Sequence, residues 1–377
     1  MVDKFVEYVE KWYKSYYHYA TNQLYVQFHI TRLCESRCAH CYFNVLEPIK
    51  NTLSLEQCKY VIDNISQAAQ DVGRKALVDF TGGDPLLHPD IYQILKYCCE
   101  KNISTGLKCN SHMISTSSIN MLKECNVERI YLSLEGLENT NDMIRGKGDF
   151  NRTIKAISLL KEQGFYVRVH MTISKQNMND VIELMNFFVD NKFIIDVFSW
   201  SRFWSSENSQ FLIDWQDFKK MMENQFIYLK KLYNSDDFYV SLENGECVPK
   251  IGFEFKEHLW FPFLLKKNII SYKLYEDLSL FRNSINCSST RHVYIIDNNG
   301  DVLKCRKISD MKIGNIFTEN FSKMLFNSHN KRCAALIEDS ECGKCKYYNV
   351  CAGCPAMAYA KNFNRFSKDP DCFLDIN

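Results

Sequence analysis

The sequence predicts an α/β protein in which a partial (β/α)6 TIM barrel is followed by a small, cysteine-rich domain with a β-hairpin. Short apolar runs alternate with amphipathic stretches from residue 24 to about residue 200, and this alternation indicates a parallel sheet with right-handed crossovers. Beyond residue 280, cysteines become frequent, and the turn sequence Asp297-Asn298-Asn299-Gly300 separates two short apolar runs. A turn of this composition is typical of a hairpin between antiparallel strands.

Six apolar runs have the length and composition of strands: Leu24–Ile30, Ala76–Phe80, Ile103–Leu107, Arg129–Leu134, Tyr166–Met171 and Ile194–Phe198. Five stretches between them have helical spacing: Ser54–Ala69, Asp90–Glu100, Ser115–Glu124, Phe150–Gln163 and Asn179–Asp190. Six strand–helix units are too few for a closed barrel of eight strands. We therefore expect an open barrel, with its chemistry at the carboxyl ends of the strands.

The remaining segments suggest a division into four parts. Residues 1–23 have aromatic side chains at helical spacing and are expected to form a helix on the barrel edge. Residues 24–200 form the core, 201–280 an irregular, aromatic bridging region, and 281–377 the cysteine-rich domain. The pairs Val293–Ile296 and Val302–Lys304 are the expected strands of its hairpin.

The composition excludes several classes of function. The chain has 377 residues, is 46% hydrophobic and has a formal net charge of +1, so we expect neither nucleic-acid nor membrane binding. We find no signal peptide and no run long enough to cross a bilayer, and we expect a cytoplasmic protein. Its 17 cysteines are then metal ligands and free thiols instead of disulfides.

The first cysteine array, Cys34-x3-Cys38-x2-Cys41, directly follows the first strand. A cubane iron–sulfur cluster takes four ligands, one per iron, so three thiolates leave one iron open for a reactant, as in catalytic zinc sites. A zinc site is the alternative. Zinc usually takes paired C-x2-C knuckles and a fourth ligand, and His40 is the one obvious candidate nearby.

The C-x3-C-x2-C loop resembles the signature of radical SAM enzymes, and three further segments extend the resemblance. Gly82-Gly83-Asp84-Pro85 resembles the family's G-G-E-P, Ser133-Leu134-Glu135-Gly136 resembles S-L-D-G, and Arg145-Gly146 resembles the R-G that follows it. The resemblance implies a [4Fe-4S] cluster on Cys34, Cys38 and Cys41, with S-adenosylmethionine (SAM) on its open iron.

The same resemblance implies how SAM is held. Gly82, Gly83 and Asp84 would bind the methionine amino group. Ser133 and Arg145 would bind the carboxylate, and Glu135 would lie near the ribose. His40 stands where the family usually has an aromatic residue against the adenine. His170 is a weaker candidate, because a single His on a strand is more often structural.

The second array contains Cys287, Cys305, Cys342-x2-Cys345-x5-Cys351-x2-Cys354 and Cys372. It resembles the SPASM extension of peptide-modifying radical SAM enzymes, although its last knuckle is one residue short. On spacing alone a zinc ribbon is an equal alternative, and the first motif favours clusters. The resemblance assigns Cys287, Cys305 and Cys354 to auxiliary cluster I, and Cys342, Cys345, Cys351 and Cys372 to auxiliary cluster II.

Seven thiolates cannot fill two clusters of four ligands each. Phe281 stands where many members of the family have an eighth cysteine. Either Cys247 supplies the missing ligand, or auxiliary cluster I keeps an open iron for substrate or water.

The resemblance implies an enzyme that cleaves SAM reductively to a 5′-deoxyadenosyl radical and oxidatively modifies, by crosslinking, residues of a ribosomally made peptide. It would use three [4Fe-4S] clusters, SAM, and an electron donor such as flavodoxin or ferredoxin. Arg306 stands where sulfatase maturases usually have an Asp base, which argues against that activity, and no catalytic base can be named. The alternatives are a SPASM-type dehydrogenase of a small molecule, a sulfatase-maturase-like oxidase, and a non-enzymatic Fe–S carrier or zinc-stabilised module.

Overall fold

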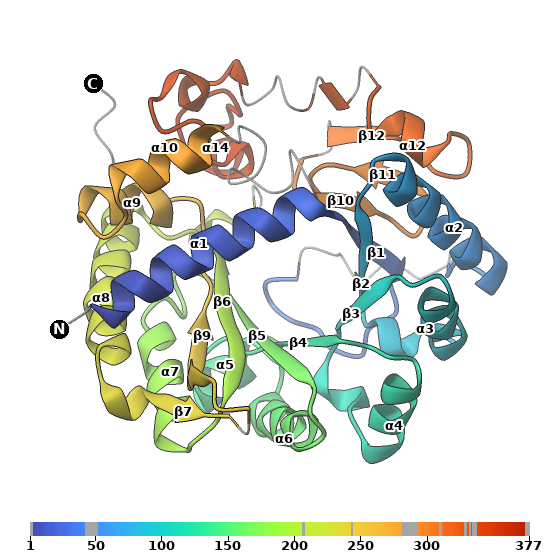
Figure 1. The fold of residues 1–377 in the computed structure, drawn as a ribbon, viewed down its shortest axis with the longest axis horizontal. Helices are drawn as coiled ribbons and strands as arrows, with labels where there is room; N and C mark the ends of the chain where they lie inside the picture. The colour runs from blue at the N-terminus through green and yellow to red at the C-terminus, as the bar shows by residue number, and fades with distance from the viewer. Residues whose placement is uncertain are drawn as a thin grey trace.

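The structure, a computed structural model, describes residues 3–41, 52–205, 208–242, 244–280, 293–308, 311–327, 330–331, 333 and 338–373. Within these ranges, ten strands form one mixed, curved sheet in the order β12-β11-β10-β1-β2-β3-β4-β5-β6-β9 (Figure 1). A separate antiparallel pair, β7–β8, lies at the edge of the molecule.

Strands β1 to β6 are parallel and form the partial barrel. Their bounds are Gln23–Thr31, Lys75–Gly82, Ser104–Lys108, Arg129–Ser133, Tyr166–Ile173 and Ile195–Arg202. All six predicted strands are therefore present, each shifted by a few residues at most. Side chains alternate along them, so the apolar ones pack against the outer helices while polar ones face the inside of the arc.

Helices cover the outside of this arc, where α2, α3, α4, α6 and α7 are visible (Figure 1). The helices of the N-terminal half are α1 Lys4–Asn22, α2 Leu55–Asp71, α3 Ile91–Glu100, α4 Thr116–Glu124, α5 Glu138–Arg145, α6 Asp149–Glu162 and α7 Asp180–Asp190. The capping box at the start of α2 is present, with Ser54 and Gln57 in reciprocal hydrogen bonds. Helix α5 was not predicted, because its eight residues are mostly polar and bury only three side chains.

The bridging region is more regular than the sequence indicated. It contains α8 Trp215–Tyr233, α9 Trp260–Lys266, α10 Tyr272–Leu280 and the short strands β7 Tyr239–Ser241, β8 Cys247–Pro249 and β9 Ile251–Phe253. The prediction of an irregular segment was wrong. Phe218, Met222, Leu229 and Tyr233 are buried on one face of α8, a helical spacing that the many aromatic residues around it obscured.

The predicted hairpin is confirmed as β10 Val293–Ile296 and β11 Asp301–Leu303. In addition, β10 pairs parallel with β1, from Tyr25–Val293 to Phe28–Ile296, so the hairpin extends the barrel sheet. Beyond it lie β12 Lys312–Asn315, α12 Phe321–Met324 and α14 Pro355–Asn362. Short 3-10 turns occur at Pro85–Leu87, Ser111–Met113, Ser209–Phe211, Asp236–Phe238 and Glu341–Lys344.

Helix α1, predicted from its aromatic spacing, packs Phe5, Tyr8 and Tyr13 against α8, α9 and the segment after β9. Asp3 caps its first turn by accepting a hydrogen bond from the Val6 amide. In the part of the chain that the structure describes, no helix has both the length and the apolar character needed to cross a membrane.

Candidate functional site

The first cysteine loop lies between the carboxyl end of β1 and α5. Cys34 and Cys38 are half-buried and Cys41 is exposed. The Asn110 side chain, just beyond β3, donates from Nδ2 to Cys34 Sγ at 3.3 Å, and the Ala39 amide donates to the Ile144 carbonyl at 2.9 Å. The loop is thus held from both sides while its last cysteine stays accessible.

Two glycines, the last residue of β2 and the residue after it, lie against the end of β1 and the start of this loop. The Gly83 amide donates to the Thr31 carbonyl at 2.8 Å, and the Asp84 amide donates to the Leu33 carbonyl at 2.6 Å. A Cβ atom on Gly83 would lie 2.1 Å from the Leu33 carbonyl oxygen, and one on Gly82 would lie 2.1 Å from that of Thr31. Only glycine permits this backbone approach, which explains the Gly-Gly pair on local grounds.

Asp84 is fully buried, and its carboxylate is occupied by backbone groups. Oδ1 accepts from the Leu86 amide at 3.0 Å and Oδ2 from the Asn110 amide at 3.1 Å. Burial raises the pKa of this carboxyl to about 6, with the two amide hydrogen bonds opposing the shift. Asp84 therefore positions Asn110, and through it the contact to Cys34.

Arg145, at the end of α5, joins the other residues of the predicted SAM site. Its Nη2 donates to Asn110 Oδ1 at 2.9 Å and its Nε donates to Asp149 Oδ2 at 2.8 Å, while Nη1 lies 3.8 Å from Glu135 Oε1. Arg145 is only 8% exposed. A surface salt bridge, the simplest alternative for an arginine, is therefore not what the structure shows.

Glu135 and His40 close the same cluster. His40 Nε2 lies 3.3 Å from Glu135 Oε1, and Glu135 Oε2 accepts from the Thr172 amide at 2.7 Å. Ser133, half-buried at the end of β4, pairs in register with His170 of β5. The structure thus brings together Gly82, Gly83, Asp84, His40, Ser133, Glu135 and Arg145 at the strand ends around the cysteine loop.

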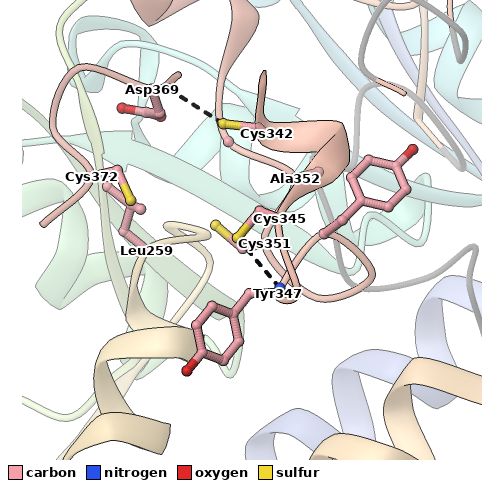
Figure 2. A pocket seen from close by; sticks show the side chains of 10 residues that line it. Leu259, Cys342, Cys345, Tyr347, Cys351, Ala352, Asp369 and Cys372 are labelled. Carbon is pink, nitrogen blue, oxygen red and sulfur yellow. Dashed lines mark hydrogen bonds between the residues drawn. The ribbon is translucent and has the colours of Figure 1, made fainter. Parts of the chain in front are cut away.

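Four cysteines of the second array line a single pocket (Figure 2). Cys342, Cys345, Cys351 and Cys372 face a volume of about 300 Å³ that includes its open mouth. The Asp369 amide donates to Cys342 Sγ and the Tyr347 amide to Cys345 Sγ, both at 3.4 Å. These are the four residues that the resemblance assigned to auxiliary cluster II.

The turn between Cys351 and Cys354 explains how the shortened knuckle fits. Ala352 and Gly353 both have positive φ, at 60° and 66°. A Cβ on Gly353 would lie 2.5 Å from Cys342 Sγ. The left-handed backbone at these two residues lets the chain turn between Cys351 and Cys354 with two intervening residues, where the SPASM pattern usually has three. A residue larger than glycine at 353 would displace the Cys342 sulfur.

Cys305 and Cys354 lie near each other outside this pocket. The Lys307 amide donates to Cys305 Sγ at 3.4 Å, and burial, with the nearby Cys354 thiol, raises the pKa of Cys305. Cys287 and Phe281, which complete the expected environment of auxiliary cluster I, lie outside the described residues. Cys247 is exposed on β8, next to β7, and Figure 1 shows β7 at the edge of the molecule opposite α14 and β12. That position does not support Cys247 as the missing ligand.

The candidate metal ligands of both regions are cysteine sulfurs. Among the residues that the structure describes, no three or more His, Cys, Asp or Glu side chains converge on the position of a single metal ion. A cubane does not require such convergence, because each thiolate binds a different iron. Four cysteines around one pocket, with amides donating to two of the sulfurs, match the donor set of a [4Fe-4S] cluster, whose properties such hydrogen bonds tune.

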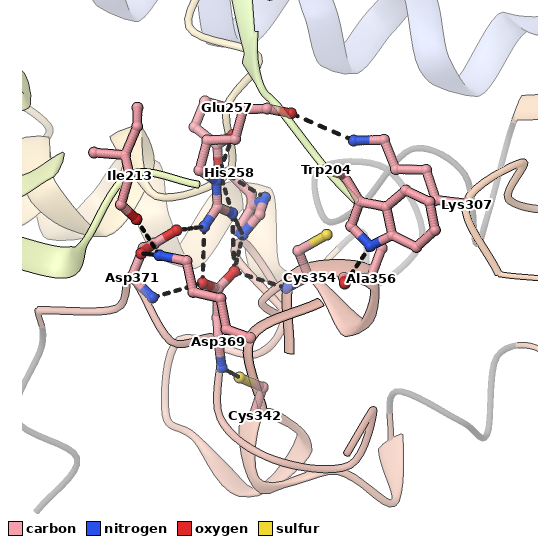
Figure 3. A network of polar contacts seen from close by, with 12 residues as sticks. Trp204, Ile213, Glu257, His258, Lys307, Cys342, Cys354, Ala356, Asp369 and Asp371 are labelled. Carbon is pink, nitrogen blue, oxygen red and sulfur yellow. Dashed lines mark hydrogen bonds and ion pairs between the residues drawn. The ribbon is translucent and has the colours of Figure 1, made fainter. Parts of the chain in front are cut away.

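A buried ionic network connects the barrel to the cysteine pocket (Figure 3). Arg202, the last residue of β6, donates from Nη1 to Asp369 Oδ1 at 2.9 Å and to Asp371 Oδ2 at 2.7 Å, and from Nη2 to Glu257 Oε1 at 3.0 Å. The Cys354 amide in turn donates to Asp369 Oδ2 at 3.0 Å. Asp369 therefore contacts the chain at both Cys342 and Cys354.

Sequence reasoning missed the roles of Asn110, Asp149, Arg202 and Asp369. Asp149 lies four residues after Arg145, a spacing that could have suggested a helical ion pair, although a turn separates the two helices. The sequence contains no local signal for the pairing of Arg202 with Asp369, because 167 residues separate them.

Comparison with known proteins agrees with this geometry. Residues 28–188 match the sequence model of the Radical SAM superfamily. These residues are a radical SAM domain, and the protein is an enzyme. The α/β fold with its mixed sheet is therefore the radical SAM fold.

Similar proteins include enzymes and biosynthesis proteins that are named for different products. The Fe-coproporphyrin III synthase of Methanosarcina barkeri is 24% identical, over 93% of this chain and 87% of that protein. The antilisterial bacteriocin subtilosin biosynthesis protein AlbA of Bacillus subtilis is 26% identical, over 90% of this chain and 68% of that protein. The structure of Streptococcus suis SuiB bound to its precursor peptide SuiA superposes with a TM-score of 0.68 at 21% identity, covering 98% of this chain and 79% of that one.

Proposed function

We propose that this radical SAM enzyme contains a C-terminal SPASM domain, residues 281–377, and oxidatively modifies a ribosomally made peptide by crosslinking its residues. The observation that carries the proposal is the pocket formed by Cys342, Cys345, Cys351 and Cys372. A radical SAM domain alone does not require a second thiol site.

Cys34, Cys38 and Cys41 would hold the cluster to which SAM binds. When bound, this pair supplies reductive cleavage of SAM and hydrogen-atom abstraction from a substrate carbon. The chain's own contribution is positioning. Gly82 and Gly83 give the backbone close access, and Asn110 orients Cys34.

Arg145 would bind the SAM carboxylate with Ser133. Its guanidinium is already oriented by Asn110 and Asp149, so little side-chain freedom is lost on binding. Glu135, held by the Thr172 amide and His40, is the remaining polar group on that side.

Two further clusters would accept electrons from the substrate or bind it. Cys342, Cys345, Cys351 and Cys372 would hold one, and Cys305, Cys354 and Cys287 the other. The short contacts of Asp369 with the chain at Cys342 and Cys354 would keep the two sites at a fixed spacing. An external donor such as flavodoxin or ferredoxin would supply the first electron.

A peptide substrate is supported by two relatives. AlbA is named for bacteriocin biosynthesis, and SuiB was solved with a precursor peptide. A second candidate is a step of haem formation that consumes iron coproporphyrin III, because AdoMet-dependent haem synthases also match over 92% of this chain.

Both candidates are tested with one anaerobic assay. The protein is reconstituted with iron and sulfide, reduced with dithionite and incubated with SAM and either a short peptide encoded beside its gene or iron coproporphyrin III. Formation of 5′-deoxyadenosine with a peptide that has lost two hydrogen atoms supports crosslinking. An unchanged peptide and a converted porphyrin support the second candidate, and no 5′-deoxyadenosine with either substrate contradicts both.

A further inference from the structure

Three basic side chains meet on the inner face of the barrel. Lys108 lies on β3, Arg168 on β5 and Lys256 just after β9; we call these three residues the lumen cations. Lys108 pairs in register with Tyr131, and Tyr131 with Arg168, so the first two lie in one row across adjacent strands. Their strand neighbours Leu107, Val167 and Val169 are buried in the apolar core on the opposite face.

The lumen cations are held in place by defined contacts. Lys256 Nζ lies 3.1 Å from His170 Nδ1, and the two His170 ring nitrogens lie 3.0 and 3.1 Å from the Ser199 and Ser201 hydroxyls. Lys108 Nζ donates to the Tyr25 hydroxyl at 3.0 Å. The ammonium groups of Lys108 and Lys256 are therefore oriented by hydrogen bonds to uncharged groups, which do not neutralise their positive charge.

Nearby carboxylates do not balance these charges. Asp79 lies 3.5 Å from Lys108 and is shared with Arg129, also at 3.5 Å. Glu254 lies 2.8 Å from Arg168 and only 4.0 Å from Lys256. Arg129 also pairs with Glu128 at 2.8 Å. Asp79 and Glu254 are therefore the carboxylates set against the three lumen cations, and one positive charge is left in excess.

The two lysines keep more accessible surface than the carboxylates. The side chains of Lys108 and Lys256 are 25% and 33% exposed, whereas those of Asp79 and Glu254 are 0% and 13% exposed. Burial, only partly opposed by these carboxylates, lowers the pKa of both lysines to about 8. An incoming anion would meet the ammonium groups first and would relieve the cost of holding them charged.

The lumen cations lie near the residues proposed to bind SAM. His170, the partner of Lys256, pairs in register with Ser133, and the Thr172 amide two residues further on donates to Glu135. On the other side, Arg306, which follows Cys305, is close enough to lower the pKa of Lys108 and Lys256. The lumen cations therefore lie between the residues proposed for SAM and Cys305.

We propose that the lumen cations bind a carboxylate of the substrate and so fix the carbon that reacts. The proposal rests on the proposed function, in which substrate enters this space, and it adds the chemical class that the space accepts. The carboxylate of a glutamate or aspartate side chain in a peptide and the propionate of a porphyrin share this chemistry, so the test must distinguish the two.

The test measures binding without turnover. Protein reconstituted with iron and sulfide is saturated with SAM and left unreduced. It is then titrated by calorimetry with N-acetyl-glutamate methylamide, which has one carboxylate, on its side chain. We expect it to bind about tenfold or more tightly than N-acetyl-glutamine methylamide, because charge-assisted hydrogen bonds to ammonium groups are lost in the neutral analogue.

Variants assign that difference to the lumen cations. Lys256→Met and Lys108→Met should each weaken binding of the glutamate probe by about tenfold, while Lys256→Arg, which keeps the charge, should stay within about threefold. Lys14→Met is the matched control, because Lys14 is 61% exposed on α1, and it should leave binding unchanged. The same variants are titrated with coproporphyrin III, to tell whether the carboxylate belongs to a peptide or to a porphyrin. Loss of affinity for either carboxylate probe supports the proposal.

A pH series adds an independent check. The glutamate probe should bind more weakly as pH rises through about 8, where Lys108 and Lys256 lose their charge. The charged and titratable groups facing them are Asp79, Arg129, Arg168, His170, Glu254, Glu257, His29, Arg306, Tyr25 and Tyr131. Burial lowers the pKa of both histidines and raises that of Tyr25 and Tyr131. Despite burial, Asp79 and Glu254 raise the pKa of Arg129 and Arg168, so none of these six groups gains or loses charge between pH 7 and 9.

Binding of both carboxylate probes, glutamate and coproporphyrin III, that Lys256→Met and Lys108→Met leave unchanged would overturn the proposal. Because no reduction is involved, this failure is separate from failure of the proposed function, which shows as absent 5′-deoxyadenosine.

Discussion

The two cysteine regions of this protein differ in how much of each thiol site the chain encloses. The first loop leaves Cys41 exposed and contacts Cys34 with one side chain, Asn110. The second region surrounds its sulfurs, with Cys342 and Cys351 buried and backbone amides donating to Cys342 and Cys345. An accessible site suits a cluster that binds a reactant, and an enclosed site suits one that only exchanges electrons.

The carboxylates beside the two regions differ in the same way. Asp84, near the first loop, is buried without a cation, and its pKa is raised to about 6. Burial alone would also raise the pKa of Asp369, but the charge and hydrogen bonds of Arg202 lower it overall. The charge of Asp84 beside the first region should therefore change with pH near 6. Asp369 beside the second region stays charged, because it is paired with Arg202.

The largest expected effect separates the two regions by cysteine removal. Cys38→Ala should abolish 5′-deoxyadenosine formation and remove about four irons per chain. Cys351→Ala should remove a similar amount of iron but leave SAM cleavage measurable, because its pocket is separate from the first loop. Iron analysis and chromatography of the reaction products check this. Equal loss of SAM cleavage in both variants would show that the two regions do not act separately.

Arg202→Met should have the next largest effect, on stability. It leaves Asp369, Asp371 and Glu257 without their shared cation, and breaking a buried ion pair costs about 3–5 kcal/mol. The free energy of unfolding from denaturant titration measures the loss. Arg152→Met, on the exposed surface of α6, is the control and should change stability by less than about 0.5 kcal/mol. A loss as small as the control's would mean that the network does not stabilise the second region.

Arg145→Lys should act on the first region alone. Lysine cannot reach Asn110, Asp149 and a ligand carboxylate with one ammonium group, so SAM affinity should fall about tenfold, or about 1.4 kcal/mol. Equilibrium SAM binding to the unreduced enzyme measures it. Iron bound by the second region should not change, and unaltered SAM affinity would remove Arg145 from the proposed SAM site.

Acid pH should give the smallest effect and sharpen the contrast between the carboxylates. As pH falls from 7 to 5, Asp84 becomes protonated near 6 and loosens its hold on the Asn110 amide. SAM binding should weaken several-fold. Asp369, whose pKa is lowered, stays ionised, and the stability it contributes is lost only at much lower pH. The absorbance of clusters in the second region should therefore stay constant, and a parallel loss would contradict the assignment.

Much of the fold followed from local pattern, and what did not follow depends on distant contacts. The six barrel strands and the β10–β11 hairpin could be predicted because apolar alternation and a turn sequence are local signals. The pairing of β10 with β1 joins residues more than 260 positions apart, as in Phe28 with Ile296, and no periodicity encodes it. Helix α8 was missed although its buried face has helical spacing.

The candidate site divides in the same manner. The motif residues around the first loop could be found from the sequence because most of them lie at or just after the end of a strand, and the strand ends meet in space. The polar residues that orient them, such as Asn110 and Asp149, became apparent only with the contacts. The lumen cations lie on separate strands and follow no motif, so only the sheet register brings them together.

The hydrogen-bonded pairing of β10 with β1 has a mechanical consequence. The hairpin that leads to Cys305 cannot swing away from the barrel without breaking a ladder in the middle of the sheet. Thermal fluctuation should therefore change the separation between the first cysteine loop and Cys305 very little. The rate of electron tunnelling between the clusters proposed there would be set by the fold itself and not by an opening motion.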